Sequence, residues 1–566
     1  MPAPQDRPWL ASYAEGVPAD IDVTDETLCD LLDRSVARFS AHIALDFYGA
    51  TTSYAKVGEL VARVAGSLKA LGIVAGDRVA IVLPNCPQHV IAFYAVLRLG
   101  AIVVEANPLY TSEELSYQLA DSGARLAIAW DVVAPTIESI RSQTSITQVV
   151  AVNMTTALPR GKRIALRLPL ARARATRTAM TSPAPGALTW KKLVTDGWPL
   201  TTTHVRPTAD SLAVLQYTGG TTGVPKGAML THRNLRANAA QGRAWVPGLV
   251  DGEEVIYAVL PLFHAYGLTL CLTFAIGIGA TLVLFPRFDA EQVLEAMERR
   301  PATFLPGVPP IYSALASAAV AKAVDLRSIH FALSGAMPLP TTTVDHWEAT
   351  TGGLLVEGYG MTETSPVSIG NPIAPSRRPG TVGVPFPSTR IRIVDPANPD
   401  EDCADDDAGE LLVQGPQVFV GYWNRPDDTA DVLLDGGWIR TGAIVVMAAD
   451  GFVTVVDRIK ELIITGGFNV YPSQVENVLR QVPEVQDAAV VGLPDGSGGE
   501  RVVAAIVCEP GTHPDPESVR NACREHLTAY KVPRQVFIVD ELPRSLIGKV
   551  LRRRVREQLL EHPDRR

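Results

Sequence analysis

Apolar residues recur along the first part of the chain in two alternating patterns. In Tyr54–Leu71 they fall three or four residues apart, and Gly72 follows, which predicts a helix with one buried face and a glycine stop. Arg78–Leu83 (RVAIVL) predicts a buried strand, Gln88–Leu99 a helix and Ala101–Glu105 a second strand. Strands that alternate with helices indicate parallel sheets covered on both faces.

The same alternation continues through the middle of the chain and changes character near residue 457. Further strands are expected at Ser211–Thr218, Thr281–Phe285 and Ile329–Ser334, and Asn398–Ala408, rich in aspartate, predicts a loop. Beyond 457 a compact stretch predicts strands at Ala488–Val491, Val502–Cys508 and Gln535–Val539. It also predicts a helix at Pro516–Leu527. We therefore expect an α/β protein with a large N-terminal domain (1–457) of mixed and parallel sheets covered by helices, followed by a small α/β domain.

One long stretch carries no charge. Val255–Pro286 contains no Lys, Arg, Asp or Glu and is long enough to span a bilayer. Proline, histidine and glycine break it into VIYAVL, LTLCLTFAIGIG and ATLVLF. These pieces predict a buried strand, a buried helix and another buried strand. A core segment is therefore favoured over a membrane span.

Composition and charge narrow the class of protein. The 566 residues are 47% hydrophobic and 20% charged, the balance of a globular protein with several cores. A net charge of −9 argues against general nucleic-acid binding. The six cysteines show no paired short spacing, which favours a reducing compartment such as the cytoplasm. The N-terminal residues contain no apolar core of a secretory signal. The sequence does not indicate an oligomeric state.

The segment from 136 to 195 differs in charge from the rest. Its only acid is Glu138. Seven basic residues crowd into its middle: Arg160, Lys162, Arg163, Arg167, Arg172, Arg174 and Arg177. A solvated surface excursion is one interpretation. The other is a patch that meets anionic lipid head groups as a peripheral contact at the inner face of the membrane.

A glycine- and threonine-rich stretch, YTGGTTGVPKG (Tyr217–Gly227), follows an apolar run. Its glycines let the backbone approach an anion, and Lys226 supplies a point charge for phosphate. A concave array of N–H groups in such a loop can hold a polyphosphate. Because Pro225 precedes the lysine and Gly227 follows it, the stretch is not the P-loop of nucleotide triphosphatases.

This loop resembles the signature of the adenylate-forming superfamily, which contains acyl-CoA synthetases, adenylation domains of peptide synthetases and firefly luciferase. Gly219, where many members have serine, resembles the fatty acyl-CoA synthetase branch. Further motifs follow in the family's order between about Tyr54 and Arg553. The resemblance implies an AMP-forming ligase that uses ATP, Mg²⁺ and coenzyme A.

Three motifs of the large domain carry the implied nucleotide and acyl sites. PLFHAYGL (Pro261–Leu268) resembles the motif whose histidine, His264, lines the acyl pocket together with Gly335. LSGAMPL (Leu333–Leu339) and EGYGMTET (Glu357–Thr364) resemble adenine- and phosphate-binding segments. The implied ATP- and AMP-binding residues are Thr218, Gly219, Gly220, Thr221, Thr222, Gly223, Lys226, Gly335, Ala336, Glu357, Gly358, Tyr359, Gly360, Met361, Thr362 and Arg458.

The resemblance also implies roles for single residues of these motifs. Tyr359 would stack on adenine, and Thr362 would reach the α-phosphate. Glu363 would hold Mg²⁺ with Thr218, since a carboxylate is a hard oxygen ligand. Thr362 and Glu363 are therefore implied to be catalytic, together with the lysine described next.

The last two motifs imply a mobile small domain. VDRIKELIITGGFNVYP (Val456–Pro472) resembles the family's hinge, here 458–462, between the large domain and a small domain at 463–566. Lys460 would be the residue about which the small domain turns. PRSLIGKVLRR resembles the motif of the catalytic lysine, Lys549. The residues implied to approach coenzyme A are Gly466, Gly467 and Phe468.

One position departs from the family's pattern. The family has Thr-Gly-Asp where this chain has Thr441-Gly442-Ala443, and that aspartate accepts hydrogen bonds from both ribose hydroxyls of ATP. Alanine accepts neither. Asp435 and Asp450 are the neighbouring carboxylates that could take its place.

The basic segment and the apolar stretch after His264 resemble long-chain fatty acyl-CoA synthetases, so a fatty acid is the expected substrate. Four alternatives stay open at this point. An aryl acid ligase of the coumarate type shares the same frame, and a fatty acyl-AMP ligase would stop at the adenylate. Ala443 motivates a nucleotide-binding pseudoenzyme. A membrane-embedded binding protein would be built on Val255–Pro286.

Overall fold

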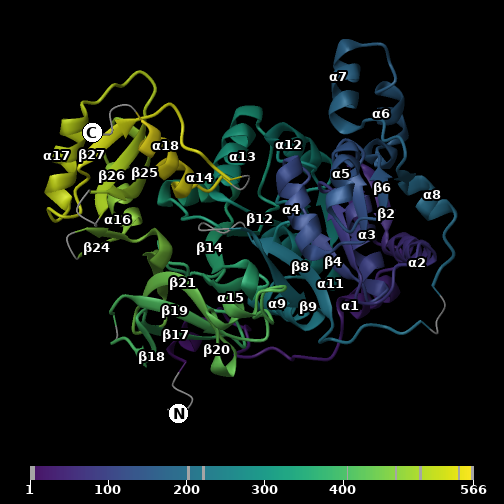
Figure 1. Ribbon diagram of the computed structural model, residues 1–566, viewed down its shortest axis with the longest axis horizontal. Helices are drawn as coiled ribbons and strands as arrows, with labels where there is room; N and C mark the ends of the chain where they lie inside the picture. The colour runs from purple at the N-terminus through teal and green to yellow at the C-terminus, as the bar shows by residue number, and fades with distance from the viewer. Residues whose placement is uncertain are drawn as a thin grey trace.

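The computed structural model describes residues 7–200, 204–218, 224–404, 406–465, 468–495, 500–545 and 548–562. Figure 1 shows a large body, coloured purple to green, and a smaller part in yellow that carries the C-terminus. The mixed α/β architecture expected from the alternating pattern is confirmed.

The first sheet of the large body has seven strands in the order β7-β6-β5-β3-β4-β8-β9. All neighbours are parallel except β8 and β9, which form an antiparallel hairpin at one edge. The strands are β3 (Arg78–Val82), β4 (Ile102–Glu105), β5 (Leu126–Trp130), β6 (Gln148–Val152), β7 (Leu188–Thr189), β8 (Leu212–Thr218) and β9 (Lys226–Thr231).

Helices cover both faces of this sheet, as the alternation predicts. On one face lie α2 (Tyr54–Ala70), α3 (Pro87–Arg98) and α8 (Trp190–Thr195); on the other lie α4 (Ser112–Ser122) and α5 (Ala134–Ile140). The start of α4 follows from a capping box, in which the Thr111 side chain accepts from Glu114 N and the Glu114 side chain accepts from Thr111 N.

The second sheet has nine strands in the order β16-β15-β14-β13-β12-β10-β11-β1-β2. Its central strands are parallel, with antiparallel pairs at both edges. The strands are β1 (Ile43–Phe47), β2 (Ala50–Ser53), β10 (Val255–Ala258), β11 (Thr281–Leu284), β12 (Phe304–Gly307), β13 (Phe331–Ser334), β14 (Leu354–Gly360), β15 (Val367–Gly370) and β16 (Val384–Pro385). Its helices are α1 (Leu28–Arg38), α9 (His232–Trp245), α12 (Ala290–Arg299), α13 (Pro309–Lys322) and α14 (Thr341–Thr351).

The charge-free stretch is part of the core, as expected. Between β10 and β11 the chain forms α10 (Ala265–Gly267), a π-helical turn (Leu268–Thr273) and α11 (Phe274–Gly277). Every residue of the π-helical turn is buried. Within the described ranges, no helix has the length and apolar content needed to cross a bilayer. The expectation of a buried strand, helix and strand is therefore confirmed.

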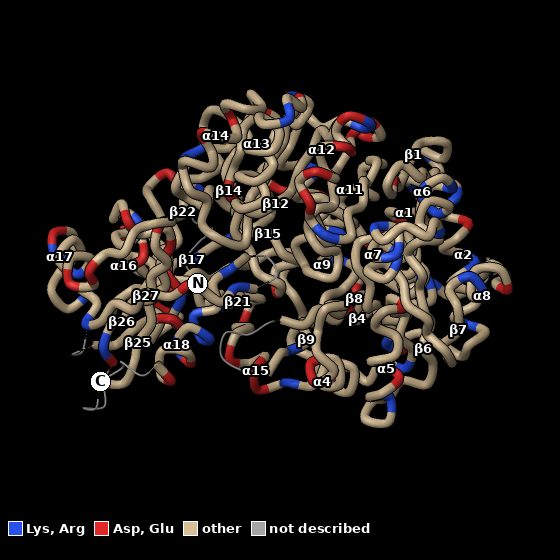
Figure 2. The backbone as a smooth tube through the Cα atoms, turned by 90° about the horizontal axis from the view of Figure 1, so that it is seen from above, with Lys and Arg blue, Asp and Glu red and all other residues tan. Residues whose placement is uncertain are grey.

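The basic segment forms a helical hairpin that stands out from the body at the top right of Figure 1. It comprises α6 (Arg160–Ala165) and α7 (Ala171–Met180), and neither helix buries a residue. Figure 2 shows blue basic positions along both helices. The segment is therefore exposed at the surface, as both interpretations of it require.

A third, antiparallel sheet closes the large body. Its strands are β17 (Arg390–Asp395), β18 (Asn398–Asp402), β19 (Gly409–Gln414), β20 (Leu433–Leu434), β21 (Trp438–Met447) and β22 (Val453–Arg458). The prediction of a loop over Asn398–Ala408 is wrong for its first half, because β18 pairs with β17 at the edge of the sheet. Asp402 accepts from Arg392 Nε at 2.8 Å, so pairing with β17 outweighs the low strand propensity of aspartate.

The C-terminal part has cores of its own. The strands β25 (Val485–Pro494), β26 (Glu500–Cys508) and β27 (Gln535–Ile538) form one sheet, and β23 (Ile463–Thr465) pairs with β24 (Phe468–Val470). Two clusters of buried apolar residues lie entirely beyond residue 462. The helices are α16 (Pro472–Leu479), α17 (Pro516–His526) and α18 (Arg552–Glu561). A smaller C-terminal α/β unit is therefore present.

Candidate active site

The phosphate loop expected at Tyr217–Gly227 joins β8 to β9. Thr218 ends β8 and pairs with Lys226, which starts β9. Gly219, Gly220, Thr221, Thr222 and Gly223 lie outside the described residues. The loop is therefore described only at its two ends, where the antiparallel pairing closes it.

Helix α4 fixes the base of this hairpin. The Tyr217 hydroxyl donates to Asp121 Oδ2 at 2.6 Å, and the Tyr117 hydroxyl donates to the Pro225 carbonyl at 2.9 Å. A Cβ on Gly227 would lie 3.2 Å from the Tyr217 ring, so a side chain there would press on that ring. Neither tyrosine contact was predicted, because α4 is about a hundred residues away in sequence.

Lys226 has partners outside the hairpin. Its Nζ forms an ion pair with Asp428 of α15 (Pro426–Ala430) and lies 5.3 Å from the centre of the Tyr422 ring. The Tyr422 hydroxyl in turn donates to Glu363 Oε1 at 2.6 Å. The expected phosphate lysine and the expected metal carboxylate are thus connected through one tyrosine, which sequence reasoning did not single out.

Glu363 is buried beneath this arrangement. It lies in the 3₁₀ turn Thr362–Thr364, directly after β14 and Met361, and is 6% exposed. Burial raises the pKa of its carboxyl, and the hydrogen bond from Tyr422 and the charges of Arg458 and Lys226 oppose that rise. Within the part of the chain that is described, no group of three or more His, Cys, Asp and Glu residues could hold a metal.

The motifs LSGAMPL and EGYGMTET lie at the carboxyl ends of adjacent parallel strands, where open α/β sheets bind ligands. Ser334 of β13 is in register with Glu357 of β14, so Gly335 and Ala336 follow beside β14. A Cβ on Gly360 would lie 1.9 Å from the Pro366 carbonyl oxygen. Only glycine fits there, because β14 and the segment after Glu363 approach so closely.

Glu357 and Tyr359 have shifted pKa values in this strand. Burial raises the pKa of Glu357 to about 8, with a backbone hydrogen bond from Leu339 acting in the opposite direction. Burial also raises the pKa of Tyr359, and a hydrogen bond with Thr441 opposes that rise. Thr441 belongs to the same Thr-Gly-Ala segment as Ala443. The expected adenine-binding strand, β14, therefore lies beside the segment that departs from the family's pattern.

Ala443 is buried in the middle of β21, opposite Arg458 of β22. Neither of the two carboxylates expected as substitutes lies beside it. Asp435 is exposed in the turn before β21, and Asp450 lies in the turn beyond β21, where it pairs with Arg378 at the surface. Each of them lies past an end of β21, so neither stands next to Ala443 in the strand.

Lys549, the expected catalytic lysine, belongs to the small C-terminal unit and lies near Arg458. Lys549 lies in the loop between β27 and α18, and its amide donates to Ser545 Oγ at 3.2 Å. A Cβ on the adjacent Gly548 would lie 3.6 Å from Pro310 Cγ of α13, so this loop touches the large body. Burial lowers the pKa of Lys549 to about 7, and the nearby Arg458 lowers it further.

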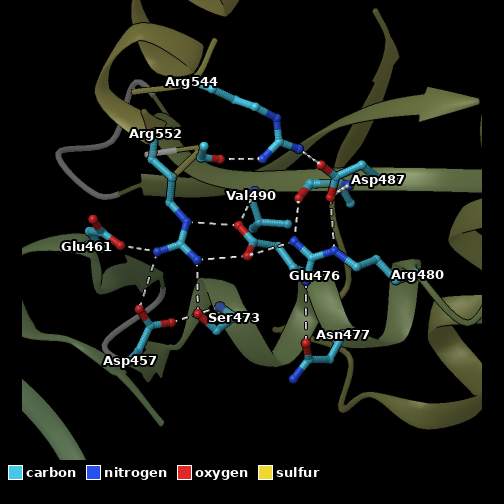
Figure 3. A network of polar contacts seen from close by, with 12 residues as sticks. Asp457, Glu461, Ser473, Glu476, Asn477, Arg480, Asp487, Val490, Arg544 and Arg552 are labelled. Atoms are coloured by element: carbon cyan, nitrogen blue, oxygen red, sulfur yellow. Dashed lines mark hydrogen bonds and ion pairs between the residues drawn. The ribbon is translucent and has the colours of Figure 1, made fainter. Parts of the chain in front are cut away.

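Arg552 joins the two units beside the hinge, as Figure 3 shows. Its guanidinium donates to Glu476 at 2.8 and 2.7 Å and to Ser473 Oγ at 2.9 Å. It also forms ion pairs with Glu461 and, at 3.5 Å, with Asp457. Lys460 lies in the 3₁₀ turn Ile459–Glu461 within the predicted hinge. Arg552 was not predicted as a site residue, although it follows Lys549 in the quoted motif.

His264 caps α10, and its Nδ1 accepts from Tyr266 N at 3.3 Å. Burial lowers its pKa to about 4, so the ring is neutral at physiological pH. A Cβ on Gly335 would lie 3.2 Å from the Tyr266 ring, which places the end of β13 against the histidine's segment. Gly466 and Gly467 lie outside the described residues, as does the side chain of Phe468.

Comparison with known proteins shows the family of this chain. The family model of the AMP-binding enzymes matches residues 32–423, and that of the AMP-binding enzyme C-terminal domain matches residues 474–549. A long-chain-fatty-acid–CoA ligase of Bacillus subtilis (strain 168) is 38% identical over 561 residues, covering 98% of this chain and 99% of the relative. A feruloyl-CoA synthase of Amycolatopsis sp. is 34% identical over 92% of this chain and 97% of the relative.

Solved structures show the same architecture. ATP-bound MatB from Rhodopseudomonas palustris superimposes with a TM-score of 0.80 at 29% identity, covering 94% of this chain and 98% of that one. The anthranilate CoA ligase AuaEII in complex with anthranoyl-AMP gives a TM-score of 0.80 at 26% identity, covering 95% and 98%. With the motif residues gathered at the carboxyl ends of β13 and β14, this chain belongs to the family of AMP-binding enzymes.

Proposed function

We propose that this chain is an AMP-forming long-chain fatty acid–CoA ligase. The observation that carries the proposal is the position of Lys549, which is half-buried near Arg458 with its loop against α13 of the large body. Packing alone gives no reason for a charged lysine to lie there, because burial and the neighbouring Arg458 both disfavour its charge. The name of the Bacillus subtilis relative, which matches nearly the whole chain, supports a long-chain fatty acid as the substrate.

In the first half-reaction the fatty acid's carboxylate oxygen attacks the α-phosphorus of ATP, and pyrophosphate leaves with the electrons of the broken P–O bond. Negative charge is spread over the phosphoryl oxygens, so pre-positioned cations and hydroxyls stabilise the transition state. We assign Lys549 to the α-phosphate and carboxylate oxygens. Thr362 contacts the α-phosphate, and Lys226 and the loop from Thr218 to Gly223 hold the leaving phosphates.

The residues present fit a magnesium ion that arrives with ATP. Mg²⁺ commonly binds through one or two carboxylates and substrate phosphates rather than in an all-protein cage. Glu363, a single buried carboxylate, suits that mode, and the Thr218 hydroxyl is the second ligand we assign. When bound, the ion neutralises charge on the phosphates.

In the second half-reaction the thiol of coenzyme A attacks the acyl carbonyl of the adenylate, and AMP leaves. Lys549 has no role in that step. We assign the hinge to Lys460 and the approach to pantetheine to Gly466, Gly467 and Phe468, with the small domain (463–566) turning about 458–462. Separate apolar cores beyond residue 462 support rotation of this unit as a body.

The acyl group would lie beside His264. A histidine whose pKa burial lowers to about 4 adds no charge to an apolar pocket. The buried π-helical turn that follows it supplies apolar surface for a long chain. An aryl acid is the second candidate, because a relative 34% identical over 92% of this chain is named feruloyl-CoA synthase.

We also propose that the helical hairpin α6–α7 makes a peripheral contact with the anionic inner face of the membrane. Its basic residues surround three exposed apolar side chains: Ile164 at 64%, Leu168 at 47% and Leu170 at 58% exposure. Basic residues near anionic head groups and apolar residues at the interface act together in such contacts. The partner is a lipid surface, which is also where long-chain fatty acids are found.

Acid-dependent exchange of pyrophosphate into ATP, measured over a panel of fatty and aryl acids, tests the proposal. We expect exchange to be fastest with long-chain fatty acids and thioester to form when coenzyme A is added. Fastest exchange with aryl acids would favour the second candidate. Exchange without thioester would indicate a fatty acyl-AMP ligase. Nucleotide binding with no exchange would indicate a pseudoenzyme.

A further inference from the structure

The ion pair between Lys226 and Asp428 brings an acid into the expected phosphate site. Lys226 begins β9, directly after the phosphate loop, and Asp428 lies on the short helix α15. Both side chains are 33% exposed. The pair is therefore open to solvent on one side, and a ligand from solution can reach the lysine.

Asp428 is held on a frame that is attached to the same strand as Lys226. Met229 N donates to the Gly421 carbonyl at 2.9 Å, and Trp423 N donates to the Gly227 carbonyl at 2.8 Å. Thr429 Oγ1 accepts from Tyr422 N at 2.9 Å and donates to the Arg425 carbonyl at 2.7 Å. Because the turn before α15 is bonded to β9, the carboxylate of Asp428 stays next to Lys226.

A lysine ammonium carries one charge and three donors on a flexible stem. A carboxylate and a phosphate are rival partners for that one charge. The Tyr422 ring, whose centre lies 5.3 Å from Nζ, attracts the ammonium whichever anion is bound. The ammonium can therefore exchange partners with little movement of the chain.

We infer that Asp428 is an internal competitor of polyphosphate for Lys226. In the free protein it holds the lysine in position; the β- and γ-phosphates of ATP displace it, and it takes the lysine back as pyrophosphate leaves. The inference rests on the proposed role of Lys226 in binding phosphate. It adds to that role a residue that limits polyphosphate affinity and aids product release.

Binding of inorganic pyrophosphate and of AMP to the full chain, measured by calorimetry, tests the inference. Exposed ion pairs are worth about 0.2–1 kcal/mol, so Asp428→Asn should tighten pyrophosphate binding by a factor of about 1.4 to 5. AMP lacks the β- and γ-phosphates, so its affinity should not change. The matched control is Asp427→Asn, which removes the same charge from an exposed neighbour and should leave both affinities unchanged.

A double-mutant cycle separates competition from a general effect of charge. With Lys226→Met in the background, Asp428→Asn should no longer tighten pyrophosphate binding. Equal affinities for wild type and Asp428→Asn, an equal effect of Asp427→Asn, or no pyrophosphate binding by either protein would overturn the inference. Asp428→Ser repeats the test if the asparagine variant unfolds. Tighter pyrophosphate binding without acid-dependent exchange would keep the inference and reject the ligase.

Discussion

Ala443 of β21 lies directly opposite Arg458 of β22. Directly opposed residues on antiparallel strands have Cβ atoms about 4.5–5.5 Å apart on the same face. Arg458 therefore faces a methyl group where the family's pattern would give it a carboxylate. The adjacent Asp457 does not fill that place, because its oxygens accept from Ser473 N at 2.7 Å and from Arg458 N at 2.8 Å.

Ala443→Asp should lower the KM for ATP without changing kcat. An aspartate there would accept hydrogen bonds from the ribose hydroxyls, and bonds to a charged group are worth about 1.5–3 kcal/mol each. A combined gain of about 2–3 kcal/mol corresponds to roughly 30- to 150-fold. The ribose keeps its contacts through the reaction, and interactions equal in ground and transition states change KM rather than kcat. Steady-state kinetics at saturating acid and coenzyme A measure both constants.

The control for this variant is Ala443→Asn, which has similar volume but no charge and should give a smaller gain. No change in either variant, with ATP already bound tightly by wild type, would mean that another group holds the ribose. Asp435 and Asp450 are poor candidates for that group because both lie beyond the ends of β21. No activity in any form would favour a pseudoenzyme.

The alternation of apolar runs was sufficient to predict the layered sheets, because a parallel strand buried on both faces needs a continuous apolar sequence. Lys226 and Glu363 were identified through their motifs. Tyr422, which connects them, was not singled out: its hydrogen bond to Glu363 spans 59 residues. Asp428 is 202 residues from Lys226, and no local pattern links two such positions. Contacts between distant segments depend on how the sheets pack, which periodicity does not encode.

Lys549→Ala should slow adenylate formation by about 100- to 1000-fold, the usual effect of removing one group that stabilises transition-state charge. Thioester formation from supplied acyl-adenylate should change little, because the lysine is not used there. Single-turnover assays of each half-reaction separate the two steps. As a control, Lys531→Ala removes a lysine of the same unit that hydrogen-bonds Gln474, and it should affect neither step. Equal loss of both half-reactions in Lys549→Ala would contradict a role confined to the first.

Neutralising the hairpin should weaken its association with anionic vesicles. Each basic residue near such a surface is worth about 1 kcal/mol. The variant replaces six of them with glutamine: Arg160, Lys162, Arg163, Arg167, Arg172 and Arg174. Sedimentation with phosphatidylserine vesicles at low salt should fall sharply, whereas Lys191→Gln, an exposed change on α8, should not affect it.

The apolar tip of the hairpin has a separate effect. Leu168→Ser with Leu170→Ser should weaken vesicle binding about tenfold or more even at high salt, since burying a leucine contributes about 1.5–3 kcal/mol. If vesicle binding depends on the basic residues alone and the two leucine substitutions do not weaken it, these leucines stay outside the lipid. A wild type that does not sediment with vesicles at all would leave the hairpin as a solvated surface.

Glu357 should make the folded protein less stable as pH rises. Burial raises its pKa to about 8, whereas an unfolded glutamate titrates near 4.3. Between these values the folded protein keeps a proton that the unfolded chain has released, so the free energy of unfolding falls with rising pH over that window. The slope for one group is at most about 1.4 kcal/mol per pH unit. Glu357→Gln stays neutral at every pH and removes this contribution.

Thermal unfolding without nucleotide should therefore give similar Tm values for the two proteins at pH 5 and a higher Tm for the variant at pH 8.5. Glu298→Gln, an exposed change on α12, should follow wild type at both values. A Tm difference between Glu357→Gln and wild type that is the same at pH 5 and pH 8.5 would show that the carboxyl is ionised in the folded protein throughout.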